Sequence, residues 1–359
     1  MRWLVPKLIS AVGSRILCCA QAQEVNPLAG QDEHETLETL FRNIDLGFAK
    51  AAALRCFHTI GPGRPPRSPL GLFRTFIVMR MKGVRSLREM TRLLDTDQRR
   101  RKLCLIKKKE ATYPRSVLSR FIPKVGEDNV TGIVEEKVVK LLKRNDAKTV
   151  DAILDASFIK AWSTRHPLDN QKGLSDGDAR VGRAGKTFGL GYKLHLSIDS
   201  QTMLPLTCVF ASANQNEKKH SLNMLEKTKL ILKRSAAKLR SVIADSQYSH
   251  SKLRNAVGEA VIPYPANQKR TVKDLLRVDK KFRTYGPEHQ KLEYHKRPHI
   301  EAVYSFLKTQ YSLANNKVRG LRNVASYALY SLLCLVLNRE AAENINRTDK
   351  AVSPTYFNT

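Results

Sequence analysis

The segment Val150-Asp-Ala-Ile-Leu-Asp155-Ala156 marks the point at which the 359-residue chain changes from helical to strand-like periodicity. It is a short apolar run, and it predicts a buried β-strand that ends near Asp155. Residues 192–198 alternate apolar and polar side chains, which predicts a second, half-buried strand. Further strands are predicted at 204–211, 242–244 and 261–264, and helices at 221–239 and 248–257. This order predicts an α/β fold, a mixed sheet with flanking helices.

The part of the chain before this segment has helical patterns and a strong positive charge. Residues 63–150 hold 23 basic and 9 acidic side chains, a net charge of +14. Ser86-Leu-Arg-Glu89 has the spacing of a capping box that opens a helix. Short helices with basic exposed faces predict a small helical DNA-binding domain at 63–148, resembling a helix-turn-helix. A solvated basic surface on an ordinary helical bundle is the alternative.

Composition shifts suggest the remaining boundaries. Residues 1–62 hold 6 basic and 6 acidic side chains, so this N-terminal segment has no net charge, and its role is uncertain. It ends at the Gly- and Pro-rich stretch 61–67, whose composition predicts a linker. The sheet-forming domain is predicted to span residues 149–344, and residues 345–359 form a C-terminal tail.

Overall composition indicates the class of partner. Lys and Arg number 63 against 33 Asp and Glu, a formal net charge of +30, so a polyanion such as nucleic acid is the expected partner. A basic membrane-surface protein is the weaker alternative. The six cysteines are scattered, which predicts free thiols in a reducing compartment. The longest late uncharged run, 323–338, is shorter than the roughly 20 residues of a membrane span, so a core helix is predicted there.

Three carboxylates stand at positions where catalysis is plausible. Asp155 and Asp245 each follow a buried apolar run, and Glu301 lies near the start of a later helix. If the first and fourth strands are neighbours, the two aspartates face each other and the helix can add the glutamate. Carboxylates gathered in one pocket repel unless cations neutralise them, and hard oxygen ligands favour Mg²⁺ or Mn²⁺. Two such ions promote phosphodiester displacement. Asp151 is a rival of Asp155.

The residues around Glu301 support this interpretation. Glu301 and Lys308 are seven residues apart, so they share one face of the predicted helix, two turns from each other. Pro298 is predicted to hold Arg297 in an extended conformation just before the helix, and Tyr294 lies three residues earlier. A carboxylate flanked by these tyrosine, arginine and lysine side chains suits a metal site beside a DNA phosphate backbone.

The residues around Glu301 resemble a motif of a known family. Tyr294-x2-Arg297-x3-Glu301-x6-Lys308 resembles the complete Y-R-E-K signature of insertion-sequence DDE transposases. Three further segments resemble the family's first catalytic strand, its second strand and its second catalytic segment: Leu154-Asp155-Ala-Ser-Phe-Ile-Lys160, Gly191-Tyr-Lys193-Leu-His195 and Ile243-Ala-Asp245-Ser-Gln-Tyr248. The resemblance covers about residues 63–340. Gln247 departs from it, because many members have glycine there.

The resemblance implies an RNase H-like core that cleaves DNA at element ends and transfers the strand into target DNA. It implies that the catalytic and metal-binding residues are Asp155, Asp245 and Glu301, with two Mg²⁺ or Mn²⁺ ions. It also implies DNA-phosphate contacts by Tyr294, Arg297 and Lys308. The expected partners are double-stranded DNA, as element ends and as target, and a second copy in a homodimer. No membrane is expected, and the protein is placed in the cytoplasm, on the nucleoid.

Two alternative functions remain open. A non-catalytic DNA-binding protein, such as a decayed transposase, would use the positive charge equally well. A nuclease of the same fold would nick DNA without strand transfer. Two further patterns are weak: His295 and His299 have the spacing of a zinc pair without a third ligand nearby, and Trp162 is an aromatic that either stacks on an extruded base or packs as an ordinary core or surface residue.

Overall fold

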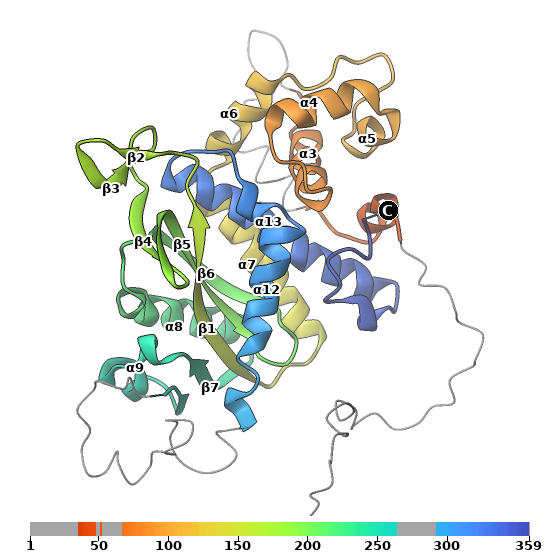
Figure 1. The fold of residues 1–359 in the computed structure, drawn as a ribbon. Helices are drawn as coiled ribbons and strands as arrows, with labels where there is room; N and C mark the ends of the chain where they lie inside the picture. The colour runs from red at the N-terminus through yellow and green to blue at the C-terminus, as the bar shows by residue number, and fades with distance from the viewer. Residues whose placement is uncertain (1–34, 48–50, 52–66, 264–291, 359) are drawn as a thin grey trace, which may run out of the picture. The chain divides into compact units, whose positions relative to one another are not determined.

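The computed structural model describes residues 35–47, 51, 67–263 and 292–358 (Figure 1). The chain divides into two compact units, and all described residues belong to the unit His34–Thr359. Of the predicted linker, only Arg67 is among the described residues. Most of the N-terminal segment 1–62 likewise lies outside them.

Six helices precede the sheet in the described part: α1 (Leu37–Arg42), α3 (Pro69–Met81), α4 (Leu87–Thr96), α5 (Gln98–Leu103), α6 (Arg115–Val125) and α7 (Glu127–Arg144). Local sequence explains where they begin. The Ser86 hydroxyl accepts a hydrogen bond from the Glu89 N–H, and the Glu89 carboxylate accepts one from the Arg85 N–H. The Ser86 half of the predicted capping box is therefore confirmed, whereas the Glu89 carboxylate bonds the N–H one residue before the N-cap.

Eight strands form one mixed sheet: β1 (Thr149–Lys160), β2 (Arg165–His166), β3 (Asp169–Gly173), β4 (Arg180–Ala184), β5 (Thr187–Asp199), β6 (Pro205–Ser212), β7 (Lys238–Ala244) and β8 (Glu259–Val261). Their order is β2-β3-β4-β5-β1-β7-β8, with β6 paired to β5. Strands β1, β7 and β8 run parallel, and the other pairs are antiparallel. The predicted mixed α/β sheet is confirmed, although β2, β3 and β4 had not been predicted.

The remaining helices are α8 (Glu217–Arg234), η1 (Ser246–Tyr248), α9 (Ser251–Asn255), α12 (Pro298–Thr309), η2 (Leu313–Asn315), α13 (Leu321–Asn344) and η3 (Thr348–Lys350). The helix predicted at 221–239 ends earlier, at Arg234, and Leu239 belongs to β7. The first strand is longer than predicted, because pairing with β5 carries β1 on to Lys160.

Helices cover both faces of the sheet. Successive residues of a strand point to opposite faces, and on β5 the Ser197 hydroxyl accepts a hydrogen bond from Thr228 of α8. The neighbouring Leu196 instead lies with α7 and α13. Helix α13 contacts α1, α3, α6, α7, α12 and β6. By length and composition this helix could cross a membrane, but 83% of its most apolar window is buried inside the protein, so it is the predicted core helix.

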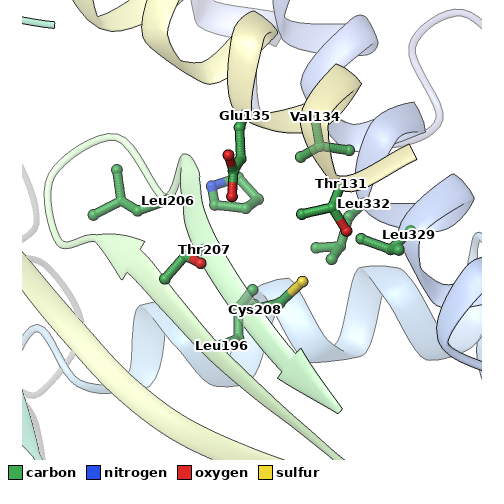
Figure 2. Close-up of a pocket in the computed structure, with 10 residues that line it drawn as sticks. Thr131, Val134, Glu135, Leu196, Leu206, Thr207, Cys208, Leu329 and Leu332 are labelled. Atoms are coloured by element: carbon green, nitrogen blue, oxygen red, sulfur yellow. The ribbon is translucent and has the colours of Figure 1, made fainter. Parts of the chain in front are cut away.

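The junction between the sheet and these helices is closely packed. Figure 2 shows Leu196, Thr207 and Cys208 of the sheet facing Thr131 of α7 and Leu332 of α13. The cavity left between them has a volume of about 10 Å³, roughly that of one water molecule. One buried apolar cluster runs from Leu37 to Phe357 and joins the early helices to the sheet. The division into domains at residue 148 stays a prediction.

Candidate active site

The register of the sheet brings Asp155 and Asp245 together. Parallel pairing between β1 and β7 ends at Leu154↔Ala244, and each aspartate is the next residue of its chain. In-register residues of neighbouring strands share one face, about 5 Å apart. Asp155 therefore lies not at the end of β1 but where β1 loses its β7 neighbour. Asp245 caps η1, and its carboxylate accepts a hydrogen bond of 2.9 Å from the N–H of Gln247.

Helix α12 is fixed against the same strand by a buried tyrosine. The Tyr304 hydroxyl lies 2.7 Å from the carbonyl oxygen of Asp155 and 3.1 Å from that of Leu194. Glu301 lies three residues before Tyr304 and Lys308 lies four residues after it. Each of the two is therefore about one helical turn from Tyr304, on the same side of α12. The Glu301 side chain is 57% exposed and Lys308 is half-buried.

Arg297 joins two of the carboxylates. Its guanidinium lies 3.5 Å from Asp155 and 3.1 Å from Glu301. The prediction that Pro298 holds Arg297 extended is wrong, since Arg297 has helical dihedrals of φ −51° and ψ −38°. A helical turn precedes α12 in the chain, and its continuation overrides the usual preference of a residue before proline. The buried Nε of Arg297 has no hydrogen-bond partner among the described residues.

Burial dominates the electrostatics of this cluster. Burial raises the pKa of Asp155 to about 6, and the nearby charges of Asp245 and Glu301 add to the rise, while Arg297 opposes it. Burial also raises the pKa of Asp245, again against Arg297. The pKa of Tyr294 is raised by burial and by the same aspartates. The structure thus brings all three predicted carboxylates and Tyr294 around one arginine.

A cleft of about 610 Å³ opens beside these residues. It is lined by the unpaired edge of β1 from Asp155 to Phe158, by Asp245, and by Lys308 of α12. Two further lining residues, Lys193 of β5 and Glu217 of α8, form a 2.6 Å ion pair with side chains 10% and 14% exposed. Glu217 had not been singled out from the sequence. An acidic residue in the first turn of a helix is favoured by the helix dipole alone, so its position gave no signal of a site.

The rival candidates have structural partners. Asp151 is 2% exposed, accepts a hydrogen bond of 2.8 Å from Ser241 and pairs with Arg240. It therefore secures β1 to β7 away from the cleft. The Nδ1 atom of His299 lies 2.6 Å from the carbonyl oxygen of Ser200. Among the residues that the structure describes, no three His, Cys, Asp or Glu side chains form a group able to hold a metal ion, and this applies to the histidine pair and to the three predicted carboxylates alike.

The donor set nevertheless suits a hard cation. Asp155 and Asp245 are adjacent oxygen donors whose burial disfavours their charged forms. The positive charge next to Asp155 and Glu301 is the guanidinium of Arg297, which contacts the two carboxylates through different nitrogen atoms. Mg²⁺ is commonly held by one or two carboxylates together with water and substrate phosphates. The two aspartates meet that requirement without a complete protein ligand set.

Comparison with known proteins identifies the class. Residues 146–337 match the family "Transposase DDE domain", and residues 26–124 match the family "Transposase domain (DUF772)". The first match covers more than half of the chain, which therefore belongs to the DDE transposase family. The sheet is accordingly the RNase H-like core of a DNA transposase, an enzyme that cleaves DNA and transfers strands. Enzymes of this family generally use divalent metal ions.

Solved structures of two transposases are similar to the chain. One is the cryo-EM structure of a piggyBac transposase synaptic complex with hairpin DNA, with 11% identity over 91% of this chain and 79% of that chain, and a TM-score of 0.48. The other is the crystal structure of a pre-cleavage Mos1 transpososome, with 9% identity over 82% of each chain and a TM-score of 0.19. No curated protein matches the chain.

The raised pKa of Asp155 leads to a prediction about stability. An unfolded aspartate has a pKa of about 3.9, so between about pH 4 and the folded value of about 6 the folded state binds more protons. The free energy of unfolding therefore falls as the pH rises through this window. We expect Asp155→Asn to raise the melting temperature of the metal-free protein by a few degrees at pH 7 and to leave it unchanged at pH 4. An equal rise at both pH values would contradict the assignment.

Proposed function

We propose that Asp155, Asp245 and Glu301 are the catalytic carboxylates of this transposase and hold its divalent metal, Mg²⁺ or Mn²⁺, as two ions. The observation that supports this most is the register Leu154↔Ala244, which makes the two aspartates neighbours at the open edge of β1. When bound, the ions supply Lewis acidity at the attacking and leaving oxygens of the phosphodiester. The match of residues 146–337 to the transposase DDE domain supports a DNA-cleaving site in this part of the chain.

The flanking residues are proposed to bind and orient the DNA strand. Lys308 lines the cleft beside Asp155, and burial lowers the pKa of its ammonium group. Arg297 has an Nε donor without a partner among the described residues, and a phosphate oxygen would satisfy it. Together with the phenol of Tyr294 these groups place the scissile phosphate over the carboxylates. Arg297 then exchanges carboxylate contacts for phosphate contacts when the metal and DNA are present.

We further propose that the substrates are the two ends of the element and a target duplex. Two ends must be held together for cut-and-paste chemistry, so a homodimer on DNA is proposed, working in the cytoplasm on the nucleoid. The helices before the sheet are proposed as the DNA-binding domain, residues 63–148. Several of their arginine and lysine side chains, among them Arg115 and Lys124, are exposed, and such charges contact phosphates without sequence preference.

The full-length protein with Mg²⁺ and a duplex carrying the end of its own element tests this function. We expect a nick that frees a 3′-hydroxyl, followed by joined product when target DNA is added. Nicking without any joined product would instead favour a nuclease of the same fold. Binding without nicking under either Mg²⁺ or Mn²⁺ would favour the non-catalytic DNA-binding protein. Denaturing gel analysis of end-labelled strands separates nicked from joined product, and a gel shift in the same buffer measures binding.

A further inference from the structure

The hairpin of β4 and β5 borders the cleft on the side away from β7. The register Ala184↔Thr187 leaves only Gly185 and Lys186 in its turn. Gly185 has a φ of +67°, a conformation that glycine adopts without strain and that two-residue hairpin turns require. Arg183, Ala184 and Gly185 line the same cleft as Asp155. The tip of this hairpin is therefore part of the cleft wall.

The hairpin carries an exposed aromatic ring. Phe188 lies opposite Arg183 in the antiparallel pair, so the two side chains share one face of the hairpin. The Phe188 residue is 70% exposed, far more than an aromatic with a place in the core. Trp162, the other exposed aromatic near this end of the sheet, differs because the ammonium of Lys317 lies 5.5 Å from its ring centre. Phe188 thus offers an exposed aromatic ring beside Arg183, which lines the cleft, and within the described residues no charged group lies over that ring.

The hairpin also carries positive charge. Within the described part of the chain neither Arg183 nor Lys186 pairs with a carboxylate, and the Nε of Arg183 donates to the carbonyl of Gly185 at 3.2 Å. Unpaired cations next to a bare aromatic ring form the combination that binds single-stranded nucleic acid. The cations contact the phosphates and the ring stacks on a base. A protein partner would not need unpaired cations and an exposed aromatic ring together beside a cleft built around catalytic carboxylates, whereas a DNA strand would.

We propose that the β4–β5 hairpin holds an unpaired nucleotide of the DNA next to the cleaved bond. Phe188 stacks on its base, while Arg183 and Lys186 contact the adjoining phosphates. This inference rests on the proposed function, because that function places the cleaved bond at Asp155. The ligand is a DNA strand locally unpaired at the element end, and the hairpin discriminates it from fully paired duplex.

The test compares two DNA probes of equal length with the full-length chain in EDTA. One is a fully paired duplex carrying the element end, and the other is the same duplex with its terminal nucleotides unpaired. Base–aromatic stacking contributes about 1–3 kcal/mol per base, so Phe188→Ala should weaken binding of the unpaired probe by roughly 5- to 150-fold. Binding of the paired duplex should stay unchanged, and Phe188→Tyr should retain the preference for the unpaired probe.

The basic residues have their own readout. The affinity falls as salt concentration rises, and each lost phosphate contact makes the plot of log affinity against log salt concentration less steep by about 0.7 to 0.9. Lys186→Ala and Arg183→Ala should therefore each make this plot less steep for the unpaired probe. Leu168→Ala is the matched control, since Leu168 is 92% exposed on the neighbouring β2–β3 turn and does not line the cleft. It should alter neither affinity nor slope.

The outcomes separate this inference from the proposed function. Equal effects of Phe188→Ala on both probes, or none on either, would overturn the inference. The inference would also be overturned if sedimentation showed that Phe188→Ala has a different oligomeric state from the wild type. That result would mean that the hairpin contacts a second copy of the chain. Binding in EDTA needs no chemistry, so a wild type that never nicks defeats the proposed function and leaves the hairpin result standing. If the wild type nicks normally but Phe188→Ala does not change binding, the proposed function stands and the inference about the hairpin fails.

Discussion

Asp245→Ala is expected to abolish Mg²⁺-dependent nicking of end-containing DNA while binding to that DNA stays intact. Asp245 is one of two adjacent carboxylates at the open edge of β1. Removing a metal-binding oxygen costs several kcal/mol of transition-state stabilisation, which corresponds to a rate loss of about 10³-fold or more. The measurement is single-turnover nicking with saturating protein, next to an affinity measurement by gel shift or anisotropy.

Asp151→Asn is the matched control for this variant. Asp151 lies on the same strand as Asp155, but its side chain pairs with Arg240 and Ser241 away from the cleft. We expect this substitution to lower the melting temperature and to leave the nicking rate per folded molecule within a fewfold of wild type. If Asp245→Ala nicks like wild type, or if Asp151→Asn loses nicking equally, the assignment of the carboxylates is wrong.

Glu340→Leu is expected to destabilise the fold severely. Lys137 of α7 is fully buried, and its ammonium lies 2.5 and 2.6 Å from the two carboxylate oxygens of Glu340 on α13. Burial lowers the pKa of Lys137, and the carboxylate opposes that shift. Removing one partner of such a buried pair costs about 3–5 kcal/mol of unfolding free energy. Urea unfolding followed by circular dichroism measures the loss.

The double variant Lys137→Met/Glu340→Leu is the control for this pair. Replacing both charges by apolar side chains of similar volume removes the uncompensated charge, and such replacements are often neutral or stabilising. We therefore expect the double variant to recover most of the stability lost in the single one. A double variant that is as unstable as Glu340→Leu would show that packing, and not the buried charge, dominates at this position.

Periodicity predicted the core of the sheet because core strands carry an apolar face. The alternation at 192–198 and the apolar run at 242–244 both correspond to strands of the structure, β5 and β7. Strands β2 to β4 have no such face. Their only buried residues are glycines, Gly173 and Gly182, and β3 reads Asp169-Asn-Gln-Lys-Gly173. These strands are held by backbone pairing at the end of the sheet, which leaves no apolar pattern in the sequence.

The sequence predicted which residues form the candidate site, but it did not predict how these residues contact one another. The positions of the acids and the resemblance to the Y-R-E-K signature predicted Asp155, Asp245 and Glu301, whereas the register that makes the two aspartates adjacent depends on pairing between distant strands. The same holds for the bridging position of Arg297 and for the ion pair of Lys193 with Glu217. These contacts join residues that only the tertiary fold brings together.

Replacement of Asp245 by cysteine tests the central claim most directly. A thiolate is a soft ligand that binds Mg²⁺ poorly and softer cations better, so a metal contact at this position makes activity depend on the identity of the ion. We expect Asp245→Cys to be as inactive as Asp245→Ala in Mg²⁺ and to regain nicking in Mn²⁺, while Asp245→Ala stays inactive in both. If Asp245→Cys stays as inactive as Asp245→Ala in Mn²⁺ as well, this carboxylate does not hold the ion that cleaves DNA.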